Sequence, residues 1–470
     1  MLKIYTQYIP EKTDKNLYCI DLLDSYNKKI IIKIIYILFI IFDIYNMSKM
    51  EFSVVSEQFV KLLIKYKKLS HNLDADNIPS SLTKNIMRKI YKLLLKYDKY
   101  LDNNLDRCLT QRLVKINNIS ELPKCDLIES RYVPITVKNH IRDKAKYHLQ
   151  YFFNCKGLKY TINFILFNDS DIYNLECYDK YIYVMLLWLL VARNQSGNKQ
   201  CSENVNIYIY MTDMLKNFPE NKVDILDVDH VNSAVTANCN KHLLIYRKEE
   251  WFKVFIHEIF HLFALDFSGY PNLTEFNDKI KTVFNIESDF NLFESYTEFW
   301  AETINLLIIS FITSSNKQNF SEIWNIFTIL LYYEQTFSMM QCIKALNYMN
   351  LQYTDLFTNK GTLLYKENTN VFSYHVIKTI LLFNIDTFLV WCDTNNLNIM
   401  QFKITERNLN LFIDFIFRHY LSRNFLQQMQ ENKELLIDLK NKSMTKRSKE
   451  YKKTVNKMLN SFRMSLFELK

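Results

Sequence analysis

Glycine is the residue that this sequence most clearly lacks. Among 470 residues, only Gly157, Gly197, Gly269 and Gly361 are glycines. The sequence contains no G-x-x-x-x-G-K-[ST] phosphate loop, no G-x-G-x-x-G fingerprint and no G-x-S-x-G elbow. Each of these motifs needs glycine for a tight turn or for close approach of the backbone to a ligand. The sequence therefore argues against a P-loop nucleotide hydrolase, a Rossmann oxidoreductase and an α/β-hydrolase.

Paired cysteines are absent as well. The nine cysteines are odd in number and scattered along the chain, and no C-x-x-C pair occurs. This pattern predicts buried free thiols rather than a disulfide framework. We therefore expect a reducing location such as the cytoplasm.

The N-terminal region has an apolar run that is too short for an ordinary membrane span. The stretch IIIKIIYILFIIFDIY at residues 30–45 is interrupted by Lys33 and Asp43, which leaves nine uninterrupted apolar residues between them. A spanning helix needs about 20 such residues. The small residues that follow a signal peptide are also missing. We interpret residues 1–46 as an extension, with marginal membrane association through residues 30–45 as the alternative.

The rest of the chain has the composition of a folded protein. The full chain of 470 residues is 49% hydrophobic and 23% charged, and its length allows two or three domains. We divide it into a helical N-terminal region at 47–150, a mixed core at 151–310, a helical C-terminal subdomain at 311–439 and a basic tail at 440–470.

Periodicity supports this division. Residues 50–115 carry apolar side chains at helical spacing, whereas 158–167 and 204–212 are typical of strands and 180–193 of a buried helix. Residues 231–247 contain two extended pieces around an Asn-rich turn. The alternation predicts an α+β core.

The basic tail suggests a partner of its own. Residues 440–463 contain nine lysines and arginines against Glu450 alone, which gives 9 − 1 = +8. Such a charge run can bind nucleic acid or an anionic membrane. The alternative is a solvated, partly helical end, since no base-reading motif accompanies the charge.

The most informative stretch is WFKVFIHEIFHLFALDFSG, residues 251–269. Residues four apart lie on one face of a helix, so His257 and His261 can reach the same ion, and Glu258 then lies beside it. This H-E-x-x-H spacing is the pattern of two zinc ligands and a general base. Burial of these three polar groups in so apolar a helix is costly without partners, and a metal would supply one.

A second acidic stretch offers the third ligand that a catalytic zinc needs. Glu294, Glu298 and Glu302 in FNLFESYTEFWAETINLL, residues 290–307, share one helix face because each four-residue step turns only about 40°. Like charges at this spacing repel one another unless a cation neutralises them.

These two motifs together resemble the gluzincin metallopeptidases, the thermolysin-like group. The resemblance implies zinc as cofactor, His257, His261 and Glu294 as its ligands, and Glu298 as the acid that orients a zinc histidine. The spacing alone also allows Glu298 as the alternative third ligand, with Glu302 then in the place of the acid four residues on. Thr297 is small and lies at +3, which favours Glu294 because the helices can then approach closely.

The resemblance covers roughly residues 155–310 and implies a zincin-like mixed sheet with an active-site helix. Residues 231–247 would supply the strand that pairs with extended substrate. The chain also resembles metallopeptidases of large DNA viruses of the mimivirus type, so a virion is an alternative location. The family's downstream oxyanion stabiliser has candidates in Tyr374 and His375.

Other residues have weaker claims. Tyr332 and Tyr333 are further candidates for the oxyanion role. The histidines without ligand spacing are expected to be structural: His71, His140, His148, His230, His242 and His419.

We therefore expect a zinc peptidase that hydrolyses peptide bonds in a polypeptide substrate, with Glu258 as general base for the attacking water. One rival is a catalytically silent zincin-like interaction protein that keeps zinc as a structural staple. The other is a nucleic-acid or membrane binder that works through residues 440–463.

Overall fold

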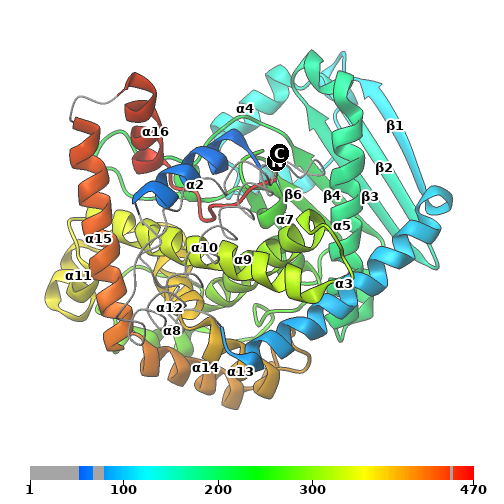
Figure 1. Ribbon diagram of the computed structural model, residues 1–470. Helices are drawn as coiled ribbons and strands as arrows, with labels where there is room; N and C mark the ends of the chain where they lie inside the picture. Colours follow the sequence, from blue (N-terminus) through cyan, green and yellow to red (C-terminus); the bar gives the residue numbers. More distant parts are fainter. Residues whose placement is uncertain (1–51, 67–78, 445–447, 470) are drawn as a thin grey trace, which may run out of the picture. The chain divides into compact units, whose positions relative to one another are not determined.

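A computed structural model describes residues 52–66, 79–444 and 448–469 (Figure 1). The chain divides into residues 1–49 and residues 50–470, and all described residues belong to the second unit. The predicted extension at 1–46, its apolar stretch at 30–45 and the histidine at position 71 lie outside the described residues.

A six-stranded mixed sheet forms one side of the fold (Figure 1). Its spatial order is β1-β2-β3-β4-β6-β5, in which β3, β4 and β6 run parallel and the other neighbours are antiparallel. The strands are β1 (Leu109–Lys115), β2 (Tyr147–Cys155), β3 (Leu158–Leu166), β4 (Val205–Tyr210), β5 (Ala234–Val235) and β6 (His242–Ile245). The short strand β5 is therefore an edge strand with β6 as its neighbour.

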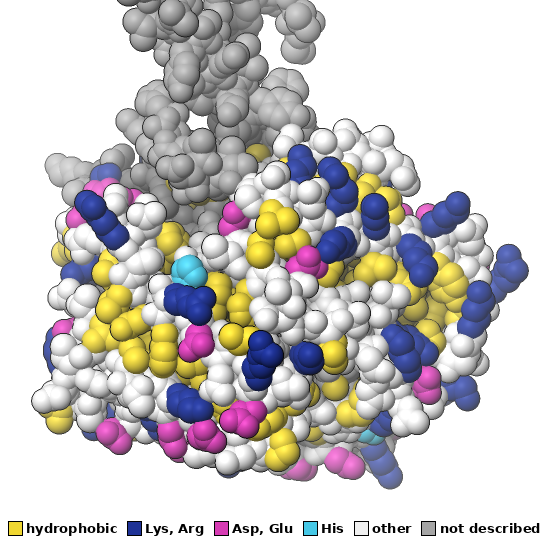
Figure 2. Space-filling model, turned by 90° about the horizontal axis from the view of Figure 1, so that it is seen from below, with side chains coloured by type: hydrophobic (Ala, Val, Ile, Leu, Met, Phe, Trp, Pro, Cys, Tyr) yellow, Lys and Arg dark blue, Asp and Glu magenta, His cyan; other side chains and the backbone are white. Residues whose placement is uncertain are grey.

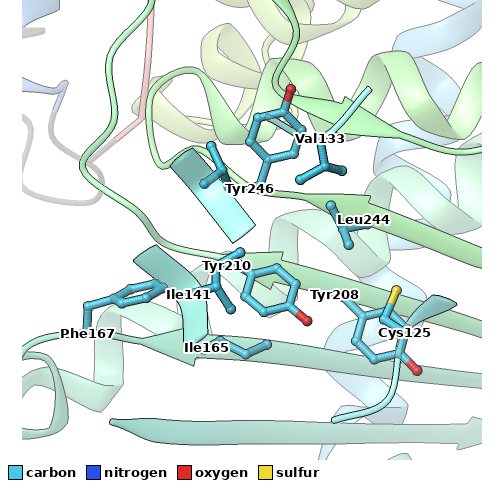
Figure 3. Packing of buried hydrophobic residues seen from close by; sticks show 10 residues of the cluster. Cys125, Val133, Ile141, Ile165, Phe167, Tyr208, Tyr210, Leu244 and Tyr246 are labelled. Atoms are coloured by element: carbon cyan, nitrogen blue, oxygen red, sulfur yellow. The ribbon is translucent and has the colours of Figure 1, made fainter. Parts of the chain in front are cut away.

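Successive residues of the central strands point to opposite faces of this sheet. Figure 3 shows one face, where Ile165, Tyr210 and Leu244 pack with Ile141 of the helix that covers them. On the other face, the ring centroid of Phe164 lies 6.4 Å from that of Trp251, which belongs to a helix. Coverage of both faces agrees with the burial of five successive residues at the end of β3 and of four at the end of β4.

Helices make up most of the remaining described residues. In chain order they are α2 (Val54–Tyr66), α3 (Ser81–Cys108), α4 (Ile135–Lys144), α5 (Leu175–Gln195), α6 (Val228–Val231), α7 (Trp251–Leu262), α8 (Thr274–Lys281), α9 (Leu292–Thr313), α10 (Phe320–Tyr348), α11 (Asn359–Leu364), α12 (Lys378–Phe383), α13 (Ile385–Asn395), α14 (Glu406–His419), α15 (Arg423–Met444) and α16 (Lys449–Asn460). A π-helical turn, η7 (Phe372–Ile377), runs directly into α12. α4 covers the sheet face of Figure 3, whereas α5 and α7 cover the other face, and α9 packs along α7.

The mixed α and β character predicted from periodicity is confirmed, as are the strands near 158–167 and 204–212. The prediction that residues 50–115 are helical throughout is wrong at its end. α3 stops at Cys108 and the chain continues as β1, which pairs with β2 over seven residues. Within β1, only Leu109 and Val114 are partly covered, and the other five residues are exposed. An exposed edge strand has little alternation to reveal it in the sequence.

The expectation that no disulfide forms is wrong for one pair. Cys201 and Cys239 are bonded across 38 residues and tie the turn between β5 and β6 to the segment that follows α5. The other six described cysteines are free thiols. Wide spacing gave no sign of this pair, because the fold brings the two residues together.

The idea of a basic tail at 440–470 is wrong for its last part. Residues 461–469, here called the docked segment, contact the N-terminal end of α7 and are almost completely buried. Arg463, which the sequence suggested as a tail charge, has no exposed surface and pairs with Glu468 at 3.3 Å. It is therefore unavailable to nucleic acid or a membrane surface. Lys449 and Lys453 on α16 remain exposed.

Within the described residues, no single helix is long and apolar enough to cross a membrane. One pair of helical segments, Phe372–Phe383 and Ile385–Asn395, reaches the required length and apolar composition together, but the two are bent by 93° relative to each other. On the face seen in Figure 2, lysine and arginine side chains are spread out, with acidic and apolar side chains between them.

Candidate metal centre

α7 places the two histidines side by side in the interior. The helix has no glycine or proline, and all twelve of its residues are buried. His257 and His261 are one turn apart, and their ring centroids lie 4.9 Å from each other. α9 packs against this face of α7 and brings its acidic side chains to the histidines.

Three side chains converge on one point. The Nε2 atoms of His257 and His261 are 3.1 Å apart, and Oε2 of Glu294 lies 3.0 Å from the first and 3.4 Å from the second. Ligands at 2.0–2.1 Å from a tetrahedral zinc are separated by about 3.3 Å. The triangle formed by His257, His261 and Glu294 therefore has the size of three corners of a zinc site.

Each histidine is held at its other ring nitrogen by a carboxylate. Nδ1 of His257 lies 2.8 Å from Oε2 of Glu298, and Nδ1 of His261 bonds to Oδ2 of Asp266. A carboxylate at Nδ1 accepts a hydrogen bond from the ring N–H, which keeps the proton on Nδ1 and leaves Nε2 with a free lone pair, the tautomer that binds a metal. Both histidines are thus oriented toward the same point by buried acids.

The three acids on α9 have three different partners. Glu294 faces the histidine pair. Glu298 is engaged at both oxygens, with His257 at Oε2 and with the ammonium of Lys253 at 2.6 Å from Oε1. Glu302 pairs with Lys378 at 2.6 Å instead. Of the three acids, Glu294 is therefore the one placed to complete a metal site, whereas the alternative third ligand Glu298 is engaged by His257 and Lys253.

The electrostatics of the cluster favour a cation. Burial by itself would raise the pKa of Glu294, but the two histidines outweigh this effect and hold that pKa at about 2. Burial by itself would lower the pKa of His261, but Asp266 and Glu294 outweigh it and raise that pKa well above its usual value. Glu258, Glu294, Glu298 and Asp266 all surround the histidines. Lys253 offsets only one of these acids, so a cation held between the histidines would offset further negative charge.

Glu258 lies next to the cluster and faces a pocket. It is a neighbour of His257 on α7, and no hydrogen bond from another described residue engages its carboxylate in the way that Glu298 is engaged. Burial is the largest effect on its pKa and raises it, although both histidines oppose the shift. A carboxylate with a raised pKa is better suited to take up a proton and to release it again, as a general base must do.

The pocket runs from the cluster to the edge of the sheet. It encloses about 750 Å³, counting space open to solvent, and is lined by Glu258, by the three residues of the triangle and by Ala234 and Val235 of β5. Because β5 is an edge strand, part of its backbone hydrogen-bonding capacity is not used by β6. An extended chain lying in the pocket can pair with this edge.

The two residues considered for the oxyanion role are separated by the fold. Tyr374 of η7 lines the pocket, and its ring centroid lies 5.9 Å from that of His257. Burial raises the pKa of Tyr374 well above its usual value, so it stays a neutral hydrogen-bond donor. His375 points away and stacks on Phe462 at 4.5 Å, outside the described pockets at the cluster. Tyr332 and Tyr333 of α10 do not line these pockets either.

Several supporting residues were not identified from the sequence. Asp266 follows His261 by only five residues, but the turn that brings it back to Nδ1 has no sequence signature. Lys253 lies one turn before His257 in an otherwise apolar stretch, and the sequence does not show that its partner is Glu298. Glu250 is buried, adopts a left-handed conformation with φ 58° and accepts hydrogen bonds from the amides of Met464 and Ser465.

Comparison of the chain with known protein families, with curated proteins and with solved structures finds no match.

Proposed function

We propose that this chain is a zinc-dependent peptidase of the gluzincin kind. One observation carries the proposal: the zinc-sized triangle of His257, His261 and Glu294 lies in the same pocket as Glu258 and the edge strand β5. A purely structural metal site is closed by its ligands, whereas a catalytic site has three protein ligands and an open position. The open pocket beside the triangle favours the catalytic alternative over a silent, zinc-stapled interaction protein.

Each part of the site has a role in this proposal. Bound zinc would act as a Lewis acid, polarising the scissile carbonyl and the attacking water. The edge of β5 would align an extended substrate by backbone hydrogen bonds. Glu258 would take the proton of the attacking water and pass it to the leaving amine. The phenol of Tyr374 would donate a hydrogen bond to the oxygen that becomes negative during attack.

The test is a comparison of the wild-type protein with Glu258→Gln. We expect both proteins to contain one zinc per chain, because Glu258 is not part of the triangle. We expect only the wild type to cleave peptides from a random library, with a loss of about 10²–10⁴-fold in the variant, the usual contribution of a general base.

Two outcomes would contradict this proposal. A wild-type protein without stoichiometric zinc removes its premise. A protein that holds zinc but cleaves no peptide, in either form, supports the silent interaction protein instead.

A further inference from the structure

The acidic face of α9 contains two buried lysine–glutamate pairs that look alike. Lys253 lies 2.6 Å from Glu298, and Lys378 lies 2.6 Å from Glu302, with all four side chains at most 2% exposed. The two glutamates are one helical turn apart. Only the first pair touches a residue of the metal triangle, since Glu298 also contacts His257.

The first pair has a geometry that bears on the metal. Lys253 precedes His257 by four residues, so both side chains project from the same face of α7. They approach Glu298 together, with the ammonium at Oε1 and the ring Nδ1 at Oε2. Met464 of the docked segment closes the far side, with its sulfur 3.6 Å from the ammonium.

Without the ammonium, Oε1 of Glu298 would be a buried carboxylate oxygen that accepts no hydrogen bond from the described residues. A carboxylate in that state can rotate toward the nearest positive charge, and a zinc ion at the triangle would be that charge. Rotation would take Oε2 away from Nδ1 of His257 and leave the imidazole free to change tautomer.

We propose that Lys253 is a positioning residue of the metal centre, which holds Glu298 on His257 and away from the metal. This inference rests on the proposed zinc site but not on peptide hydrolysis. It explains why a lysine, whose burial is otherwise costly, occupies the interior of the helix that carries the histidines. It also explains why the second of three evenly spaced acids orients a ligand rather than serving as one.

The matched pair provides the experiment. Lys253→Met and Lys378→Met each remove one ammonium from a buried pair on α9, and only the first removes it from a carboxylate that touches His257. We would measure the zinc dissociation constant by competition with a chromophoric chelator, and the visible absorption spectrum of the cobalt-substituted protein. Thermal unfolding would be followed alongside.

We expect both variants to have lower melting temperatures, because each leaves a buried carboxylate unpaired. We expect Lys253→Met to bind zinc 10- to 100-fold more weakly than the wild type and to show an altered cobalt spectrum, as for loss of a supporting interaction at a metal ligand. Lys378→Met should keep the wild-type affinity and spectrum. Unchanged zinc affinity in Lys253→Met, or an equal loss in Lys378→Met, would overturn the inference.

A second comparison covers the case in which Lys253→Met does not fold. Lys253→Met with Glu298→Gln has no unpaired buried charge at this pair, and Glu298→Gln alone already weakens the link to His257. If Lys253 acts through Glu298, the double variant binds zinc no more weakly than Glu298→Gln alone. A further tenfold loss in the double variant would show that Lys253 acts by another route. Absence of zinc from the wild type would instead refute the proposed function itself.

Discussion

Replacing Asp266 by Asn tests the support of the second histidine. The carboxylate of Asp266 is fully buried and takes four donors: His261 and Thr297 at Oδ2, and the amide and hydroxyl of Ser268 at Oδ1. An amide of the same shape has one oxygen and one NH₂ group, so it cannot accept all four. One side of the residue must lose its hydrogen bonds.

The size of the effect on zinc affinity and on stability depends on whether His261 or Ser268 loses its hydrogen bond to residue 266. If the NH₂ group faces His261, Nδ1 must become an acceptor and Nε2 carries the proton, which is the wrong tautomer for a metal ligand. We then expect zinc affinity to fall by about 10- to 100-fold, or about 1.4–2.7 kcal/mol. If it faces Ser268, two donors lose their acceptor, and stability falls by about 1–3 kcal/mol for each buried group left unpaired.

Zinc competition and thermal unfolding separate these outcomes. Ser268→Ala is the matched control, because it removes the hydroxyl donor from the same carboxylate without touching His261. We expect this control to lower the melting temperature slightly and to keep the zinc affinity of the wild type. Wild-type zinc affinity and stability in Asp266→Asn would refute the assignment of Asp266 as the acid that fixes the tautomer of His261.

Two further predictions concern the C-terminal region. Leu466→Ala should lower the free energy of unfolding by about 2–5 kcal/mol in urea titrations, because Leu466 is fully buried in the docked segment. Ile437 on α15 is half exposed, so the control Ile437→Ala should change the free energy of unfolding by less than about 0.5 kcal/mol. Replacing Lys449, Lys452 and Lys453 of α16 by Gln should leave peptide hydrolysis and zinc binding unchanged. Loss of cleavage in this triple variant would show that the basic helix contributes to the active site, and any nucleic-acid or vesicle binding that depends on charge should be lost in it.

The local parts of the site could be predicted from the sequence because helical spacing fixes them. His257 and His261 share a face of α7, and Glu294, Glu298 and Glu302 share a face of α9, whatever the rest of the chain does. The strands β3 and β4 could also be predicted locally, because their residue patterns are typical of strands.

The remaining features depend on contacts between distant residues. The partners that distinguish the three glutamates are Lys253 and Lys378, and the second lies 76 residues beyond Glu302. Buried Arg463 is partnered by Glu468 and by Ser56, 407 residues earlier, which the composition of residues 440–470 does not reveal. A run of like charges in a sequence predicts a solvated surface, because the sequence does not show which buried groups of opposite charge lie near it in the fold.

The docked segment has a consequence for the order in which the protein becomes functional. The amide of Glu468 bonds to the hydroxyl of Ser56, 412 residues earlier, and the amides of Met464 and Ser465 bond to Glu250 at the start of α7. A ribosome releases these residues long after the histidines and Glu294 have emerged. Until then, Glu250 and Lys253 lack their last partners. The surroundings of the helix that carries the two histidines are thus completed only after residues 464–468 have been synthesised.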